Sequence, residues 1–376
     1  MLLSDFIEFN PSISVAKNTT LRKFSMDQLI PNTRLVSSDR FEHFSSGPKF
    51  QNGDTLFAKI TPCLENGKTS YIQTLREGEI AFGSTEFIVC RAKPGVSLPL
   101  FVYYLMISKR IRDRAIASMT GSSGRERVQQ VELDNIQIPN YSLDFQRHIV
   151  GTIGTIDDLI ELNSRKIESC LRFIDEQYLL FDSTKTKAGC LEDYFDISIG
   201  RTPPTKEHEW FGIDGKGNIP WLSIKDMQEN KPLIFETSQW LTPNAVMKFK
   251  IPVVEPGDVL LSFKLTVGRT AIACQKMVTN EAIADFKADD NSRYWLFSFL
   301  RHSNFLSDGG NTSSIGKAVN SSIIRQFPCD FPSNDDLSHF NTIVSPIFLK
   351  MENSFRQNIV LNKQKKLLLH RYFESK

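Results

Sequence analysis

Basic and polar side chains gather in the loops that the sequence predicts, and they are the residues best suited to chemistry. Between Leu105 and Gln130 the chain carries six lysines and arginines against two acids. Arg125 and Arg127 stand there in a loop with serine and glycine neighbours, which would let a backbone phosphate approach closely. The basic residues 109–114, in a predicted helix, fit phosphate contact and a solvated helix face equally well.

Two further sets of polar side chains follow predicted strands that begin after a Gly-Asp pair. Arginine, lysine and asparagine hydrogen-bond to base edges in the major groove of DNA. Ordinary turn composition explains any single one of these residues as well, so the prediction rests on the sets as a whole. Together with the loop above and other polar loops, the predicted DNA-binding residues are Lys59, Thr61, Asn66, Lys68, Arg125, Arg127, Arg201, Lys225, Lys264, Thr266, Arg269, Asn280, Ser314 and Lys317.

Motifs that would carry catalysis are absent from the sequence. It contains no P-loop, no dinucleotide-binding fingerprint, no G-x-S-x-G elbow and no H-E-x-x-H pair. The Asn/Asp-Pro-Pro-aromatic motif of amino-methyltransferases is also missing, since residues 202–205 (TPPT) lack the amide and the aromatic ring. The six histidines and six cysteines are dispersed, without the spacing of a metal site. We therefore expect a non-catalytic chain with no catalytic residue, metal or cofactor of its own.

Composition and charge limit the kinds of partner that the chain can bind. The 376 residues carry a net charge of +2, so a polyanion would have to be met by local patches. The N-terminus lacks the features of a signal peptide, and the longest apolar run, residues 98–107, is too short to cross a membrane. We expect a cytoplasmic protein with no membrane partner and with length enough for two domains.

A long helix is predicted near the middle of the chain, over about residues 144–181. One heptad position is occupied by Ile153, Ile160, Ile167, Ile174 and Phe181, and the position three residues later by Ile156, Asn163, Cys170 and Gln177. This pattern predicts a narrow seam that packs against a single partner helix. A second long helix is predicted over about residues 335–372, where Pro346 should kink the helix or delay its start to Ser345.

The two halves of the chain share one order of predicted elements. Each half has a Gly-Asp pair, a strand, a turn, a strand, a helix, a polar loop, a Pro-marked strand and a long helix. Asp54 matches Asp258 in this order, and Asn163 matches Asn353 in the two helices. We predict an α+β fold with two domains in a pseudo-two-fold internal repeat. Two long antiparallel helices would separate the domains and form an intramolecular coiled coil.

These motifs resemble the target-recognition domains of type I restriction-modification specificity (S) subunits. In the first half the resemblance rests on NGDTLFAKITPCLENGK (residues 52–68) and AFGSTEF (81–87). In the second half it rests on GRTP (200–203), IPWLS (219–223), PGDVLLS (256–262) and VGR (267–269). The resemblance covers nearly the whole chain. It implies recognition domains over residues 1–141 and 184–332, a central long helix over 142–183 and a C-terminal long helix over 333–376.

The resemblance implies a DNA-binding subunit without a catalytic site. Each recognition domain would read one half of a split target in double-stranded DNA, and the helices would set the spacer between the halves. Two methyltransferase (M) subunits that use S-adenosylmethionine would dock on the helices. Two restriction (R) subunits would add translocation and cleavage driven by ATP and Mg. The chain departs from the family in its short start, which places the first domain almost at Met1.

Three other functions stay open from the residues alone. The chain could be a DNA-reading subunit of another restriction-modification type with the same two-domain plan. It could instead be a helix-pair scaffold that joins two protein-binding domains and does not bind DNA. The third alternative is an enzyme whose site has no recognised motif.

Overall fold

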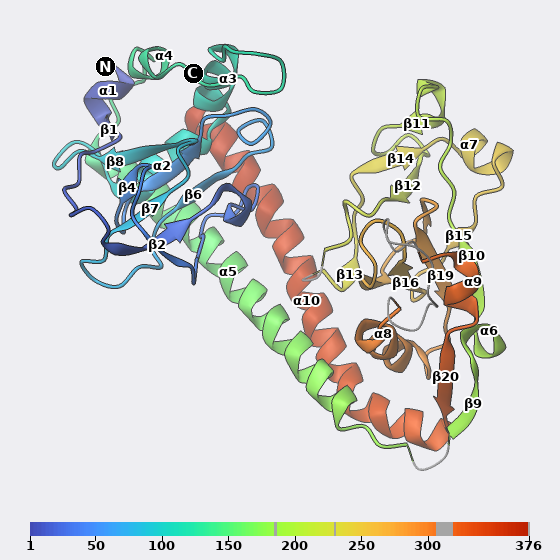
Figure 1. Ribbon diagram of the computed structural model, residues 1–376. Helices are drawn as coiled ribbons and strands as arrows, with labels where there is room; N and C mark the ends of the chain where they lie inside the picture. Colours follow the sequence, from blue (N-terminus) through green and yellow to red (C-terminus); the bar gives the residue numbers. More distant parts are fainter. Residues whose placement is uncertain (184–185, 229–230, 306–318, 375–376) are drawn as a thin grey trace. The chain divides into compact units, whose positions relative to one another are not determined.

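The computed structural model describes residues 1–183, 186–228, 231–305 and 319–374 (Figure 1). The chain divides into two units, each of which contains a part of both long helices. Unit 1 comprises Met1–Leu162 and Asn358–Lys376, and unit 2 comprises Asn163–Gln357. The two predicted long helices are confirmed as α5 (Leu143–Leu179) and α10 (Asn334–Phe373).

Unit 1 is built on two four-stranded sheets. The first has the order β1-β8-β5-β6 with antiparallel neighbours, and the second has the order β3-β2-β7-β4, in which β2 and β7 run parallel. Helix α2 packs on the first sheet with residues 101–106 all buried. The elements before α5 are α1 (Leu3–Phe6), β1 (Ile7–Phe9), β2 (Thr20–Phe24), the 3-10 helix η1 (Met26–Gln28), β3 (Phe41–His43), β4 (Lys49–Phe50), β5 (Thr55–Ala58), β6 (Thr69–Tyr71), β7 (Ala81–Gly83), β8 (Phe87–Ala92), α2 (Pro99–Ile107), α3 (Lys109–Ala117) and α4 (Gln130–Asp134).

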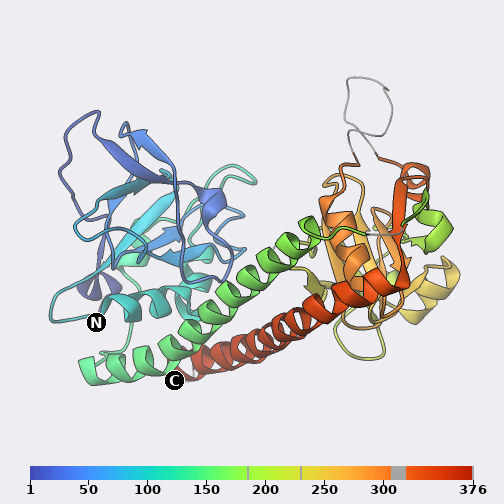
Figure 2. The same cartoon turned by 90° about the horizontal axis from the view of Figure 1, so that it is seen from below.

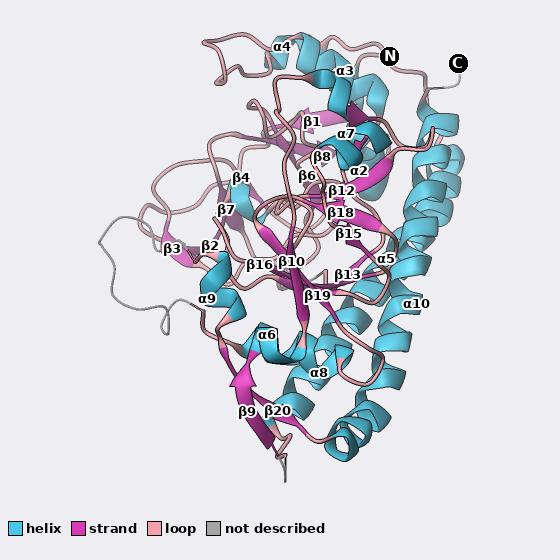
Figure 3. Cartoon of the chain, turned by 90° about the vertical axis from the view of Figure 1, so that its right-hand side faces the viewer, coloured by secondary structure: helices cyan, strands magenta, loops and turns pink. Residues whose placement is uncertain are grey.

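Unit 2 contains two five-stranded sheets, with the orders β10-β19-β16-β17-β13 and β11-β14-β12-β18-β15. Strands β9 and β20 form a separate antiparallel ribbon and lie side by side in Figure 3. The elements are β9 (Thr186–Cys190), α6 (Leu191–Tyr194), β10 (Asp196–Ile199), η2 (His208–Trp210), β11 (Phe211–Gly212), β12 (Ile219–Leu222), β13 (Leu233–Ile234), β14 (Gln239–Leu241), α7 (Pro243–Lys248), β15 (Val253–Val254), β16 (Val259–Ser262), β17 (Thr270–Ala273), β18 (Met277–Thr279), β19 (Ile283–Lys287), α8 (Arg293–His302), α9 (Ser321–Arg325) and β20 (Pro328–Pro332).

The predicted internal repeat is confirmed by the order of the strands. The order β1-β8-β5-β6 in unit 1 corresponds to β10-β19-β16-β17 in unit 2. The order β3-β2-β7-β4 likewise corresponds to β14-β12-β18-β15, and the parallel pair β2–β7 has its equivalent in β12–β18. Two domains of similar amino-acid composition need not share a strand order, because the pairing of strands distant in sequence depends on the whole fold. The shared mixed topology therefore supports a repeat.

The Gly-Asp pairs that revealed the repeat have a structural role. Asp54 accepts a hydrogen bond from the Gln51 amide at 2.9 Å, and Arg91 on β8 grips both carboxylate oxygens at 2.7 and 2.6 Å. Asp258 accepts from the Glu255 amide at 2.7 Å and pairs with Lys287 on β19. Each carboxylate therefore closes the turn before its strand and joins that strand to the next one in the sheet.

Lys287 serves two acids in unit 2. Its ammonium also lies 2.8 Å from Asp285, whose side chain is buried. Burial raises the pKa of the Asp285 carboxyl to about 6, and the hydrogen bond from Lys287 acts in the opposite direction.

In each unit, α5 and α10 form an antiparallel pair (Figure 2). In unit 1, residues later in α5 bind residues earlier in α10, as expected for antiparallel helices. The hydrogen bonds join His148 to Tyr372 at 3.1 Å, Asp157 to Lys365 at 2.6 Å, and the Ile160 carbonyl to Asn358 at 3.3 Å. In unit 2, Ile167 and Ile174 share one hydrophobic core with Val344, Phe348 and Met351. The partner of the heptad seam is thus α10 of the same chain.

Two details of α10 refine the sequence-based expectation. The helix starts at Asn334, so Pro346 does not delay its start; the proline lies inside the helix, whose axis turns in its orange part in Figure 1. Ser142 and Ser333 each accept an amide hydrogen bond from the third residue after them, at 3.3 Å in both helices. This alignment makes Ser354 the equivalent of Asn163, one residue beyond the predicted Asn353.

A buried polar network joins the helix pair of unit 1 to the sheets. The side chains of Asp157 and Lys365 are only 4% and 8% exposed, and Tyr104 on α2 donates its hydroxyl to Asp157 at 2.8 Å. One turn further along α5, the Glu161 carboxylate accepts two hydrogen bonds from the buried Arg34 guanidinium, from Nε at 2.7 Å and from Nη2 at 2.6 Å. A buried ion pair tolerates the loss of one member poorly, because the remaining charge stays desolvated.

We predict that Lys365→Ala lowers the free energy of unfolding of the full chain by about 3 kcal/mol, since Asp157 would keep a buried charge without its cation. Chemical denaturation followed by circular dichroism measures this change. The neighbouring Lys366, which is exposed, offers a matched control as Lys366→Ala. Equal losses in the two variants would contradict a structural role for the buried pair.

Candidate nucleic-acid interface

In unit 2, the turns that carry most of the predicted DNA contacts lie together. The backbone amide of Arg201 donates to the Thr279 carbonyl at 2.9 Å, and the backbone amide of Asn280 donates to the Leu222 carbonyl at 3.0 Å. The Phe263 amide donates to the Ala282 carbonyl at 3.0 Å. These bonds join residues 200–204, 223–228, 263–269 and 280–282, which we call the second loop cluster.

Six of the predicted residues belong to this cluster, and their side chains differ in freedom. Lys225 and Lys264 are exposed, and neither ammonium has a hydrogen-bond or ion-pair partner among the described residues; that of Lys264 lies 5.5 Å from the Phe263 ring centre. Arg201 is exposed but donates to the Phe249 carbonyl at 2.9 Å. The side chains of Thr266, Arg269 and Asn280 are half-buried. Ser314 and Lys317 lie outside the described residues.

Turns also meet in unit 1, and two of them correspond to turns of the second loop cluster. The Lys59 amide donates to the Glu86 carbonyl at 3.0 Å, the Thr61 amide to the Glu126 carbonyl at 3.0 Å, and the Val128 amide to the Lys59 carbonyl at 2.8 Å. These bonds join residues 59–61, 84–86 and 120–128, the first loop cluster. The Lys59–Glu86 bond holds the place in the repeat that the Phe263–Ala282 bond holds in unit 2.

The two arginines of the first loop cluster differ in their electrostatic setting. Arg127 forms a bidentate ion pair with Glu86, at 2.8 Å for the closest atoms, and this contact lowers the pKa of the Glu86 carboxyl. Arg125 is exposed, and its guanidinium has no partner among the described residues. Arg125 is therefore the cation of this cluster that is most available to a phosphate.

Asn66 and Lys68 lie at the far end of the loop that begins with Lys59. Asn66 is exposed, and its backbone amide donates to the Pro62 carbonyl at 2.9 Å. The Lys68 ammonium donates to the Met26 carbonyl at 2.7 Å, in the turn after β2. Lys68 is thus engaged with the backbone of a neighbouring turn.

Lys68 and Arg269 hold equivalent places in the repeat, directly before β6 and β17. Arg269 donates from Nη1 to the carbonyls of Ile224 and Met227, at 3.2 and 2.6 Å, in the turn after β12. Each cation therefore fastens the turn after the strand that pairs in parallel within its unit. The DNA contacts of these two residues stay a prediction, and the observed contacts give both a role in positioning a turn.

Sequence patterns did not single out Leu265, which lies between the predicted contacts Lys264 and Thr266. Its side chain is 98% exposed. The signal that could have found it is an apolar residue at the centre of a polar loop.

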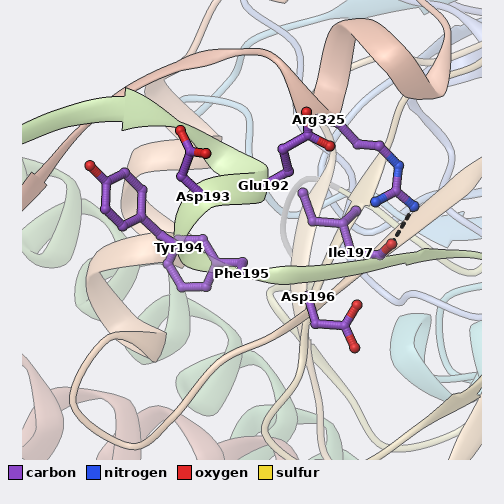
Figure 4. A pocket seen from close by; sticks show the side chains of 7 residues that line it. All are labelled: Glu192, Asp193, Tyr194, Phe195, Asp196, Ile197 and Arg325. Atoms are coloured by element: carbon purple, nitrogen blue, oxygen red, sulfur yellow. Dashed lines mark hydrogen bonds between the residues drawn. The ribbon is translucent and has the colours of Figure 1, made fainter.

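An open hollow of about 420 Å³ lies elsewhere in unit 2, beside the start of β10 (Figure 4). The Arg325 guanidinium in its lining is engaged by the Ile197 carbonyl. None of the predicted DNA contacts lines the hollow, and three carboxylates do not suit a phosphate backbone. The lining consists of Glu192, Asp193, Tyr194, Phe195, Asp196, Ile197 and Arg325.

Across the described ranges, no helix combines the length and apolar character needed to cross a membrane. Nor do three or more histidine, cysteine, aspartate or glutamate side chains of these ranges gather as a metal ion would require.

We predict that Arg269→Met speeds hydrogen exchange at the amides of residues 226 and 227 about tenfold, because the turn loses two charge-assisted hydrogen bonds. Hydrogen–deuterium exchange of the full chain measures this rate. Lys225→Met, in the same turn, is the control and should leave exchange unchanged. The positioning role of Arg269 fails if both variants exchange at the rate of the parent chain.

Comparison with known proteins gives one consistent result. Residues 185–335 match the family model of the type I restriction modification DNA specificity domain. The MjaIX type I restriction enzyme specificity subunit of Methanocaldococcus jannaschii is 26% identical over 180 residues, which cover 46% of this chain and 40% of that protein. The EcoAI specificity subunit of Escherichia coli is 32% identical over 154 residues, which cover 39% of this chain and 26% of that protein. The aligned parts thus span less than half the length of these relatives.

A solved structure shares the fold. The S subunit of a type I restriction-modification system from M. genitalium aligns with a TM-score of 0.55 and 13% identity, and the alignment covers 100% of this chain and 96% of that one.

Proposed function

We propose that this chain is a member of the family of type I restriction-modification specificity subunits and is the DNA-recognition subunit of such a system. Unit 1 and unit 2 each read one half of a bipartite target in double-stranded DNA, through the first and the second loop cluster. The chain supplies recognition, and the methyltransferase and nuclease chemistry belongs to partner subunits.

The observation that carries this proposal is that the two loop clusters share two corresponding turns. Residues 59–61 and 263–269 follow the Gly-Asp strands, and residues 84–86 and 280–282 precede the neighbouring strand of each sheet. Each cluster also presents exposed cations without a hydrogen-bond or ion-pair partner among the described residues: Arg125 in the first, and Lys225 and Lys264 in the second. A net charge of +2 leaves DNA binding to such local groups. Two such surfaces in one chain suit a target with two halves.

The domains and partners follow from the same proposal. Recognition domains span residues 1–141 and 184–332, while the helical segments 142–183 and 333–376 set the spacer and dock two M subunits. Two R subunits complete the complex, and S-adenosylmethionine, ATP and Mg bind to the partners. Exposed apolar side chains along α5 and α10 support docking there: Leu159, Leu162, Phe173, Leu349, Val360 and Leu367.

The test of recognition uses the chain assembled with its M subunits, with methylated adenines mapped across genomic DNA. The parent complex should methylate one bipartite motif. The double variant Lys225→Ala/Lys264→Ala should weaken discrimination about thirtyfold or more in one half-site only, since two base contacts of roughly 1–3 kcal/mol each would be lost.

Lys276→Ala is the matched control for this experiment. Lys276 is exposed, belongs to the same unit and pairs with Glu255 beyond the end of β17, so its loss should leave the motif unchanged. A parent complex without sequence preference would refute the proposed function. Equal weakening of both half-sites by the double variant would assign these lysines to phosphate contact instead.

The spacer role has its own test. Asn163 on α5 donates to Gln357 on α10 at 3.2 Å, so these residues mark facing positions of the pair. One heptad inserted into each helix at these positions should lengthen the preferred spacer by about 3 base pairs, from about 1.5 Å per helical residue and 3.4 Å per base pair. The methylated motif reports the spacer, and an unchanged spacer would exclude the helices as its determinant.

A further inference from the structure

Leu265 combines two features that rarely occur together in a leucine. Its side chain is 98% exposed, the highest value among the large apolar side chains of the described residues. Its φ is +62°, in the left-handed region that favours glycine and asparagine. The Thr266 amide donates to the Lys264 carbonyl at 2.7 Å, so Leu265 is the central residue of a three-residue turn with positive φ.

The turn is held in place by a buried serine. Ser262 donates its hydroxyl to the Thr266 carbonyl at 2.5 Å, and the same hydroxyl accepts the Arg269 amide at 3.1 Å. The Ser262 carbonyl accepts the Gly268 amide at 2.9 Å. Because Ser262 is fully buried at the end of β16, these bonds fix the base of the loop and leave the leucine at its tip.

An unfavourable backbone conformation that presents an apolar side chain to solvent brings no benefit to the isolated chain. Nothing is buried by it, since almost the whole side chain of Leu265 is accessible. Strained residues of this kind persist where the surroundings hold them, and they concentrate at sites that bind ligands. A bound partner that covers the side chain would supply such a benefit.

The surroundings of Leu265 indicate which partner. The flanking Lys264 is an exposed cation, and the exposed Lys225 and the half-buried Asn280 belong to the same second loop cluster. Exposed cations in the same loop cluster as a single apolar tip suit a polyanion with apolar groups inside its grooves, which describes duplex DNA.

We propose that Leu265 is a specificity-determining residue that makes an apolar contact with bases of the half-site read by unit 2. This inference rests on the proposed function and adds to it an apolar mode of recognition. The contact surface on DNA is either the methyl group of a thymine in the major groove or the faces of an opened base step.

The test compares Leu265→Ala and Leu265→Gly in the chain assembled with its M subunits. Both variants remove the apolar tip, and only glycine also removes the backbone strain. Each should bind cognate duplex DNA about tenfold more weakly, because burial of a leucine side chain is lost. In the methylation map, the loss of discrimination should fall in one half-site.

Ile213→Ala is the matched control, since Ile213 is also an exposed aliphatic residue of unit 2, follows β11, and lies outside the second loop cluster and the two helical segments. It should bind like the parent. Variants of Leu265 that bind and discriminate like a sequence-specific parent would overturn this inference while leaving the proposed function intact. A parent without sequence preference would refute the proposed function itself.

Two modified duplexes distinguish the contact surfaces. Replacing thymine by deoxyuridine in the half-site should weaken binding of the parent but not of Leu265→Ala if the leucine contacts a methyl group. A 2-aminopurine at the half-site should brighten on binding the parent, and not Leu265→Ala, if the leucine opens a base step. Either result supports the apolar contact, and the absence of any Leu265-dependent difference in both duplexes overturns it.

Discussion

A heptad seam buries its apolar side chains only against a partner helix, and this constraint organises both units. Helix α5 runs through both of them, and α10 supplies the partner in each. Consequently unit 1 is not complete until its last segment, from Asn358 onward, packs against a helix made about two hundred residues earlier. The buried Asp157–Lys365 pair secures that long-range contact, since either charge alone would be costly in the same place.

Within each unit, a carboxylate at the start of a central strand has a comparable role. Asp54 and Asp258 close a turn and bind a cation of the neighbouring strand, although the cation is arginine in unit 1 and lysine in unit 2. The ion pair between the two strands is therefore present in both repeats, while the identity of its cation differs. The strands fixed in this way end in the loops that form the two clusters.

Much of this architecture could be predicted, because it depends on local patterns. Heptad spacing revealed α5 and its single partner, and the Gly-Asp pairs revealed the repeat. Side-chain partners could not be predicted in the same way. Arg269 in a polar loop has the composition of a base contact, yet its guanidinium binds the carbonyls of Ile224 and Met227. Asp157 and Lys365 likewise look like ordinary surface charges until the register of two helices distant in sequence is known.

The attachment of Lys68 and Arg269 to main-chain carbonyls has a consequence for evolution. A carbonyl group is present whatever side chain the residue carries, so the fastened turns can exchange their side chains without losing their anchors. Substitutions at Lys225, for example, would change the exposed side chain of a turn whose backbone Arg269 holds in place. The same scaffold can therefore acquire new surface chemistries through few mutations, with little loss of stability at each step.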